Sequence, residues 1–324
     1  MLMENCIQEN KEKKFVTLSN DYKIPNICYG TDIVSKDFFS DNVCYQKVKR
    51  LFLPMKDLAK LILKKGTRQY KKDKGIIKCT NHAVENKCYF FDTSRAYGGS
   101  EKMLSQALKK YDRKNYYICT KLPNYDQLNG ISARDSLMKS MDELGVNYVD
   151  LYLIHWPVEE TYLKYWKELE GLYREGLVKA IGVSNCKIHH LEEIKKVARI
   201  MPMVDEVELH PLLTEQKLRK YCKKNGIQLM AYTSTARLDF RLKASKRMQN
   251  ICRKYKKTLS QIILKWHIQN GIIPIFNTST IDHFKNNMDI FDFTLEDDDM
   301  QIIESMNINS RTRYDSDNCE WDRL

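Results

Sequence analysis

The sequence predicts an α/β protein, a (β/α)8 TIM barrel that carries a basic helical insertion after its first strand. Eight apolar runs of strand length recur along the 324 residues, and amphipathic helical stretches lie between most of them. Eight is also the number of parallel strands that closes a barrel. An open doubly wound sheet is the alternative fold, but no G-x-G-x-x-G motif follows any of the strands.

The predicted strands are apolar, β-branched or aromatic runs bounded by polar or turn residues. In chain order they are NICYG (26–30), CYFFD (88–92), YYICT (116–120), VDLYLI (149–154), KAIGV (179–183), MVDEVEL (203–209), QLMAY (228–232) and IIPIF (272–276). Because helices separate these strands along the chain, we expect the sheet to be parallel.

Two of the predicted helices carry recognisable terminal signals. The stretch 133–145 repeats apolar residues at helical spacing and stops at Gly145, a residue type that often ends helices. The stretch 214–226 begins at Thr214, a residue type that caps helix amino termini. Both signals support helices as the connections between strands.

Composition restricts the class of protein. A hydrophobic content of 43% is enough for a packed core, and no apolar run reaches the roughly 18 residues that a membrane helix needs. The first residues, MLMENCIQENKEKKF, lack the apolar centre of a signal peptide. Ten scattered cysteines form no C-x-x-C pair. We therefore expect a cytoplasmic protein with reduced thiols, no membrane span and no metal site.

The net charge of +12 is concentrated in one segment. Residues 33–78 contain 13 Lys and Arg against 4 Asp, and the rest of the chain is close to neutral. A nucleic-acid partner is not expected, because its binding face would spread positive charge through the fold. We predict an N-terminal tail over 1–14 and a single barrel domain over 15–324, with the basic insertion at about 33–73.

The insertion contains LPMKDLAKLILKKG (53–66), which predicts a short amphipathic helix near the mouth of the barrel. Three interpretations of this segment stay open. It could be a solvated helix packed on the barrel, or a lid over a cofactor or an anionic substrate. It could also be a docking surface for an acidic partner or for membrane headgroups.

Polar side chains stand at the ends of six consecutive predicted strands. In order they are Asp92, Lys121, His155, Ser184 with Asn185, Glu206 with Glu208, and Tyr232. The carboxyl ends of barrel strands converge on one face, where active sites form. Turn chemistry does not explain Lys121 and His155, since neither residue type favours turns. This face is therefore the predicted active site.

A tyrosine five residues beyond Asp92 completes a set that suits proton transfer. The phenol of Tyr97 ordinarily titrates near pH 10, and an adjacent lysine such as Lys121 favours its ionised form. Asp92 would hold the lysine in place, and His155 would donate to a polarised carbonyl oxygen. Such a relay serves carbonyl reduction by hydride. Hydrolysis is less natural, because the chain has no G-x-S-x-G motif and no metal-ligand cluster.

The segments FFDTSRAYGGSE, YYICTKLPN, VDLYLIHWPV, KAIGVSN and VDEVELHP resemble the successive motifs of the aldo-keto reductases. The resemblance runs from about Phe15 to the end of the chain. It implies a (β/α)8 barrel that transfers hydride between NADPH and an aldehyde or ketone. It also implies that Tyr97 is the general acid, that Lys121 lowers the pKa of Tyr97, that Asp92 pairs with Lys121, and that His155 orients the carbonyl.

The same resemblance implies the binding residues. For the cofactor they are Thr31, Ser184, Asn185, Glu206, Tyr232, Thr233, Asn277, Thr278, His283 and Asn287; for the substrate they are His155 and Trp156. Tyr314 and Trp321, near the end of the chain, are further candidates for the substrate pocket, or else they pack against the barrel. A small carbonyl compound is the expected partner, and we expect a monomer.

Two departures from the family pattern affect the cofactor. Glu206 stands where the family usually has glutamine, and a charged carboxylate there would favour the oxidised nicotinamide. Asn277 and His283 replace the usual lysine and arginine that bind the 2′-phosphate, so NADPH should be held less tightly. NADP(H) is the first expectation and NAD(H) the second. A cofactor-binding sensor or regulatory protein with little turnover is the alternative to an oxidoreductase.

Overall fold

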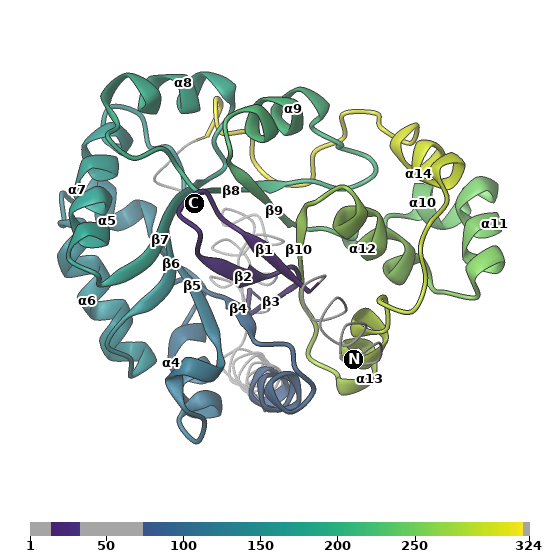
Figure 1. The fold of residues 1–324 in the computed structure, drawn as a ribbon, viewed down its shortest axis with the longest axis horizontal. Coiled ribbons are helices and arrows are strands. Elements are labelled where there is room, and N and C mark those ends of the chain that lie inside the picture. The colour runs from purple at the N-terminus through teal and green to yellow at the C-terminus, as the bar shows by residue number, and fades with distance from the viewer. Residues whose placement is uncertain (1–13, 33–73, 320–324) are drawn as a thin grey trace, which may run out of the picture.

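The chain forms a closed barrel of eight parallel strands surrounded by helices (Figure 1), in a computed structural model that describes residues 14–32 and 74–319. The barrel strands are β3 (Cys28–Gly30), β4 (Phe90–Asp92), β5 (Tyr117–Leu122), β6 (Val149–Ile154), β7 (Val178–Ser184), β8 (Val204–Glu208), β9 (Gln228–Tyr232) and β10 (Ile273–Phe276). They follow one another in chain order, and β10 closes the ring against β3. The predicted fold class is confirmed.

Helices cover the outside of the barrel. They are α4 (Ser100–Leu108), α5 (Asn124–Leu128), α6 (Ala133–Leu144), α7 (Tyr162–Arg174), α8 (Ile188–Val197), α9 (Gln216–Lys224), α10 (Phe240–Ala244), α11 (Lys246–Tyr255), α12 (Leu259–Gln269), α13 (Ile281–Met288) and α14 (Asp297–Glu304), and residues 74–85 are also helical. Short 3-10 turns occur at η2 (Arg113–Asn115) and η3 (Ala236–Leu238). Within the described ranges, every helix is too short or too polar to cross a membrane.

The two predicted helix signals have different outcomes. Helix α6 ends at Gly145 in the left-handed conformation (φ 67°), as expected. The prediction of Thr214 as an N-cap is wrong, because α9 begins at Gln216 and Glu215 precedes it with φ 47°. The left-handed turn at Glu215 delays the helix. The backbone amide of Thr214 donates instead to the side chain of Asn307 (3.2 Å).

The barrel strands are buried on both faces, because side chains fill the interior and helices cover the exterior. Every residue of β6 is buried. In β7, a Cβ on Gly182 would lie 2.5 Å from the carbonyl oxygen of Val204 and 2.7 Å from Leu153 Cδ2. Only glycine therefore allows β6, β7 and β8 to approach one another as they do here.

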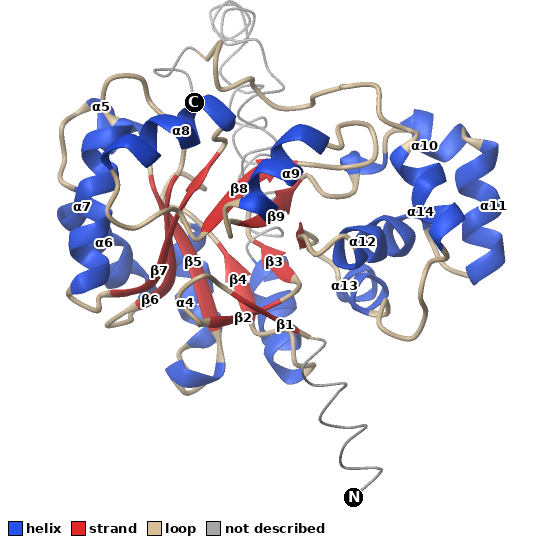
Figure 2. Cartoon of the chain, turned by 45° about the horizontal axis from the view of Figure 1, so that its top comes forward, coloured by secondary structure: helices blue, strands red, loops and turns tan. Residues whose placement is uncertain are grey.

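A β-hairpin, which the sequence analysis did not predict, closes the amino-terminal end of the barrel (Figure 2). Its strands are β1 (Phe15–Thr17) and β2 (Lys23–Pro25). The hydroxyl of Tyr22 donates to Asp150 near the start of β6 (2.5 Å), and Asn20 donates to the carbonyl oxygen of Lys179 near the start of β7 (3.0 Å). The opposite, carboxyl end carries the polar strand ends.

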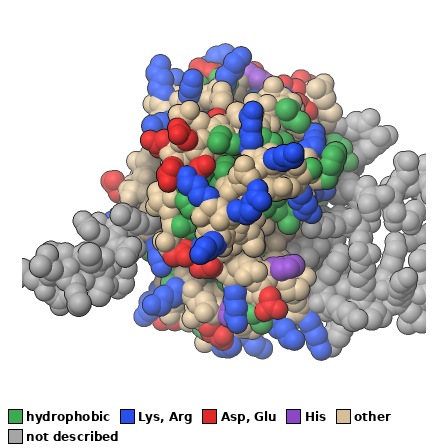
Figure 3. Space-filling view, turned by 90° about the vertical axis from the view of Figure 1, so that its right-hand side faces the viewer, with side chains coloured by type: hydrophobic (Ala, Val, Ile, Leu, Met, Phe, Trp, Pro, Cys, Tyr) green, Lys and Arg blue, Asp and Glu red, His purple; other side chains and the backbone are tan. Residues whose placement is uncertain are grey.

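Opposite charges lie together on the face that α11 to α14 form (Figure 3). Lys257 pairs there with Asp289 (2.7 Å) and Asp292 (2.8 Å), and Lys254 pairs with Asp299 (2.7 Å). The predicted basic insertion at 33–73, with its helix over 53–66, lies outside the described residues. The cysteines of the described part are free thiols, and most of them are buried.

Candidate active site

A pocket of about 560 Å³ lies at the carboxyl ends of the strands. Among the residues that the sequence predicted, its lining includes Asp92, Tyr97, His155, Trp156, Ser184, Asn185, Glu206, Tyr232, Thr233, Asn277, Thr278, His283, Asn287 and Tyr314. Thr31 and Lys121 are fully buried and lie outside this lining. Trp321 lies outside the described residues. The predicted strand ends therefore do converge on one cavity.

A buried group of charges lies beneath the pocket. Lys121 is 0% exposed, and its ammonium donates to the Asp92 carboxylate and to the carbonyl oxygen of Thr93 (3.3 Å). The Nζ atom also lies 3.3 Å from Oε2 of Glu206. The hydroxyl of Thr31 donates to the backbone oxygen of Asp92 (2.9 Å) and so supports the strand that carries this carboxylate. A buried ammonium needs such partners, because it has lost its water.

A tight turn places Tyr97 above this group. The amide of Tyr97 donates to the carbonyl oxygen of Ser94 (2.9 Å). Gly98 and Gly99 follow with φ values of 57° and 84°, a backbone conformation that glycine adopts without a steric penalty. Helix α4 then begins. The Tyr-Gly-Gly sequence therefore turns the chain sharply at the point where the phenol enters the pocket.

Tyr97 and His155 lie side by side in the pocket wall. The hydroxyl oxygen of Tyr97 is 3.4 Å from Nε2 of His155, and Nζ of Lys121 is 5.1 Å from the centre of the Tyr97 ring. Burial, together with the positive charges of Lys121 and Arg313, holds the pKa of His155 well below its usual value. The imidazole is therefore neutral at physiological pH and can donate one N–H.

The pKa of Tyr97 differs from the expectation. Burial raises this pKa well above its usual value; the ammonium of Lys121 lowers it, and the carboxyl groups of Asp92 and Glu206 raise it. The influence of Lys121 therefore has the predicted direction, but burial outweighs it. Tyr97 retains its proton, which is the state that a proton donor requires.

The pKa of Glu206 is raised, so its protonated form is favoured more than the sequence analysis assumed. Burial, and then the negative charge of Asp92, raise the pKa of Glu206 to about 8. Lys121 opposes the shift without cancelling it. A protonated carboxyl group has one donor and one acceptor oxygen, much as a glutamine side chain offers an NH₂ group and an oxygen.

Ser184, Asn185 and Tyr232 form one hydrogen-bonded group beside Glu206. The Ser184 hydroxyl donates to the backbone oxygen of Glu206 (2.8 Å), and the Tyr232 hydroxyl donates to Oδ1 of Asn185 (2.6 Å). The Asn185 amide donates to Ser184 (3.0 Å) and to the carbonyl oxygen of His155 (3.0 Å). Oε2 of Glu206 is buried without a hydrogen bond, but it lies 3.3 Å from the ammonium of Lys121. The polar atoms of Ser184, Asn185 and Glu206 together fit the amide group of a nicotinamide.

The far end of the pocket is lined mainly by neutral side chains. Asn277 donates to the carbonyl oxygen of Asp32 (3.2 Å), and His283 lines the wall nearby. Arg237 also reaches this lining, whereas Arg241 is held by Asp239 outside it. Arg237 is therefore a cation that could replace those missing from the family pattern.

Sequence reasoning missed several lining residues. Asn124 and Tyr125 line the pocket just after β5, so the strand-end rule could have found them. Arg313 also lines the pocket, and its guanidinium donates to Asp32 (3.0 Å). The segment RTRYDSD contains this arginine, but no sequence pattern connects that segment to the ends of the strands.

Comparisons with known proteins agree with this geometry. The model of the Aldo/keto reductase family matches residues 63–308. Glyoxal reductase of Bacillus subtilis is 38% identical over 231 residues, which is 71% of this chain and 82% of that protein.

Two solved structures superpose on most of the chain. MGS-M4, an aldo-keto reductase from a Medee basin deep-sea metagenome library, is 31% identical with a TM-score of 0.76, covering 94% of this chain and 99% of its own. The aldo-keto reductase AKR2E5 of the silkworm, Bombyx mori, complexed with NADPH, is 26% identical with a TM-score of 0.75, covering 93% and 89%. The chain therefore belongs to the aldo/keto reductase family, and it is an oxidoreductase.

Proposed function

We propose that the protein reduces an aldehyde or ketone to an alcohol by hydride transfer from NADP(H), with Tyr97 as the general acid. The observation that carries the proposal is the grouping of four side chains in one pocket. A phenol lies 3.4 Å from the neutral imidazole of His155, directly above the buried pair of Lys121 and Asp92. Such a group suits proton donation to an oxygen that gains negative charge.

Each of these side chains has a separate part in the proposed reaction. Tyr97 gives its proton to the substrate oxygen, and His155 orients that oxygen by donating an N–H. Burial lowers the pKa of Lys121, but the charges of Asp92 and Glu206 raise it by more than burial lowers it. The pKa of Lys121 therefore stands well above its usual value. The lysine therefore stays charged and stabilises the phenolate that Tyr97 leaves behind.

We propose NADP(H) as the cofactor, with NAD(H) as the alternative. When bound, it supplies the hydride. Ser184, Asn185 and Glu206 would hold the nicotinamide amide, and Tyr232 would offer its ring for stacking. The adenosine end would lie among Thr233, Asn277, Thr278, His283 and Asn287. The position of Ser184, Asn185 and Glu206 in the pocket lining and the NADPH bound by the silkworm relative support this assignment.

The substrate is proposed to be a small aldehyde or ketone. The relative named glyoxal reductase supports a small dicarbonyl such as glyoxal as the first compound to test. Trp156 lines the pocket next to His155 and would contact the substrate. We propose that the barrel over 15–324 carries out the reaction as a single domain.

The substitution Tyr97→Phe tests this proposal. Removing a general acid typically slows a reaction by about 10²–10⁴-fold, so kcat for glyoxal with NADPH should fall within that range. The dissociation constant for NADPH, measured by fluorescence titration, should not change. The matched control is Tyr111→Phe, because the Tyr111 hydroxyl bonds to Asn81 and Glu85 outside the pocket. Equal rates in Tyr97→Phe and wild type would contradict the assignment.

A cofactor-binding sensor on the same barrel is the alternative function. It predicts that the wild-type protein binds NADPH or NADH but reduces no carbonyl compound in a panel of small aldehydes and ketones. Titration with both cofactors separates the two expectations for cofactor choice. Binding of neither cofactor would contradict both functions.

A further inference from the structure

Glu208, at the end of β8, is a buried carboxylate for which the proposed reaction has no use. Its side chain is 0% exposed. Oε1 accepts hydrogen bonds from the amide of Thr312 (2.7 Å) and from the Thr312 hydroxyl (2.6 Å), and Oε2 accepts one from the amide of Arg313 (3.0 Å). One side chain of the barrel thus binds two consecutive backbone amides more than a hundred residues away.

The rest of the surroundings of Glu208 keep this carboxylate ionised. His210 Nε2 lies 3.1 Å from Oε1, and the Arg311 guanidinium lies 3.9 Å from Oε2. Burial alone would raise the pKa of Glu208, but the hydrogen bonds from His210, Thr312 and Arg313 hold it below its usual value. Charged acceptors form stronger hydrogen bonds than neutral ones, so the attachment is firm.

The attached residues are next to side chains that form the pocket. Arg313 and Tyr314 both line it. The Arg313 guanidinium donates to Asp32 (3.0 Å), and its charge contributes to the low pKa of His155. The position of these two side chains therefore depends on where the backbone at 312–313 is held.

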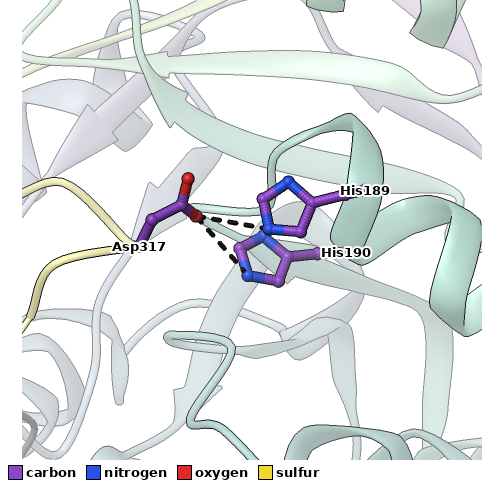
Figure 4. A group of neighbouring side chains, drawn as sticks. All are labelled: His189, His190 and Asp317. Carbon is purple, nitrogen blue, oxygen red and sulfur yellow. Dashed lines mark ion pairs between the residues drawn. The ribbon is translucent and has the colours of Figure 1, made fainter.

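A second attachment fixes the same segment to the beginning of α8. Lys187 pairs with Asp315 and with Asp317 (2.7 Å). The Nε2 atoms of His189 and His190 lie 3.3 Å and 3.8 Å from one oxygen of Asp317 (Figure 4). Two imidazoles and a carboxylate can ligate a metal ion, but here the amide of Lys187 donates to Nδ1 of His190 (3.1 Å). The proton of the neutral ring is then on Nε2, which faces Asp317. The cluster therefore attaches the C-terminal segment to α8.

We propose that Glu208 is a positioning residue for the substrate pocket. Its carboxylate holds the backbone of residues 312 and 313, so that Arg313 and Tyr314 form the wall of the pocket. The proposal rests on the proposed function, because it assigns the wall to the same carbonyl-binding site. The backbone of Glu208 pairs with that of Tyr232 in the sheet, but the hydrogen bonds of its side chain go to residues 210, 312 and 313, outside the proposed catalytic group. Its loss should therefore change how well the substrate binds and should leave the chemical step intact.

The variant Glu208→Gln tests the proposal in the full chain. The glutamine keeps one acceptor oxygen but presents an NH₂ group to one of the two amides, so one charge-assisted bond is lost and another weakened. We expect hydrogen exchange of the Thr312 and Arg313 amides to accelerate at least about tenfold. KM for glyoxal should rise by a similar factor, while kcat and the dissociation constant for NADPH stay within about twofold of wild type.

Two further variants make the result specific. Glu215→Gln is the matched control, because Glu215 pairs with the Arg311 side chain (2.8 Å) but binds no amide of the segment. Glu215→Gln should leave the hydrogen exchange of the Thr312 and Arg313 amides and the KM for glyoxal unchanged. Thr312→Val removes only the hydroxyl bond and should give a smaller rise in KM, which keeps the proposal testable if Glu208→Gln does not fold.

The outcomes separate this proposal from the proposed function. Faster amide exchange with an unchanged KM, or exchange as slow as in wild type, would overturn the role of Glu208. A fall in kcat with KM unchanged would also overturn it. If the wild-type protein reduces no carbonyl compound, the proposed function fails, and the role of Glu208 in substrate binding fails with it.

Discussion

The ammonium of Lys121 lies out of reach of water between the carboxyl groups of Asp92 and Glu206. Lys121 and Asp92 depend on each other in this arrangement, because a buried charge that loses its charged partner has no water to replace it. The group that serves the chemistry is therefore also part of what holds the strands β4, β5 and β8 together.

The substitution Lys121→Met should destabilise the protein strongly. Removing one partner of a buried ion pair typically costs about 3–5 kcal/mol in free energy of unfolding, because it leaves the other charge unpaired. Urea unfolding measures this loss. The control is Lys102→Met, whose ammonium is exposed and lies 3.5 Å from Glu143; surface pairs of this kind contribute little. Similar losses in both variants would contradict the role of Lys121.

Glu206 should make stability depend on pH. Its pKa is raised from 4.5 to about 8 in the folded protein, so between these values the native state binds a proton that the unfolded state has released. The free energy of unfolding should therefore fall as pH rises from about 5 to about 8. In Glu206→Gln, this fall should be smaller by at least about 1.4 kcal/mol, the equivalent of one pKa unit.

Urea unfolding of both proteins at about pH 5.5 and about pH 9 checks the role of Glu206. Other titrating groups are the same in the two proteins, so the difference between their pH dependences belongs to position 206. If the two proteins lose equal stability over this interval, Glu206 is already ionised near neutral pH and the raised pKa is wrong.

At the scale of single residues, the sequence predicted which side chains meet but not their protonation states. Asp92, Lys121 and His155 each lie at or just beyond the carboxyl end of a strand, and a barrel brings such positions together. The raised pKa of Glu206 depends on its burial and on the nearby charge of Asp92, and the local sequence shows neither. Glu208 was visible at a strand end, but its partners come from a segment about a hundred residues away.

At the scale of elements, β7 packs closely against both of its neighbouring strands. A Cβ at Gly182 would meet the backbone of Val204 on β8 and the side chain of Leu153 on β6. Gly182→Ala should therefore reduce the free energy of unfolding by about 1–3 kcal/mol, the usual penalty for overpacking. It should also weaken NADPH binding, because Ser184 lies two residues further along the strand.

Gly171→Ala in α7 is the matched control for this substitution. Apart from its chain neighbours and the backbone of its own helix, no atom lies within 4 Å of a Cβ at that position. Alanine is preferred to glycine inside helices by about 0.5–1 kcal/mol, so the control should be stabilised slightly. Thermal or urea unfolding of the two variants compares them directly. A neutral effect of Gly182→Ala would mean that the strands can separate locally.

The barrel strands were predictable because parallel strands buried on both faces are continuous apolar runs, and each run stands out from its polar flanks. The hairpin at Phe15–Pro25 was not predicted, because its strands, FVT and KIP, are partly exposed and form no continuous apolar run. The start of α9 was misjudged for a physical reason: Glu215 adopts a left-handed turn that local propensity does not favour.

At the scale of the whole molecule, one end of the barrel is closed and the other is functional. The hairpin covers the amino-terminal end, and the pocket occupies the carboxyl end, where the C-terminal segment contributes Arg313 and Tyr314. The family and the fold class followed from motifs in the right order along the chain. The basic insertion at 33–73 remains a sequence prediction, whereas the proposal of NADP(H) is supported by the NADPH complex of the silkworm relative.

The most direct test of the account uses NADPH labelled with deuterium at the transferable position of the nicotinamide. Incubation with glyoxal, followed by mass spectrometry of the product, shows whether the label reaches carbon. The account predicts a singly deuterated alcohol from the wild-type protein and almost none from Tyr97→Phe in the same time. Binding of NADPH by the wild type without any deuterated product, across a panel of small aldehydes and ketones, would contradict the reductase and favour the sensor.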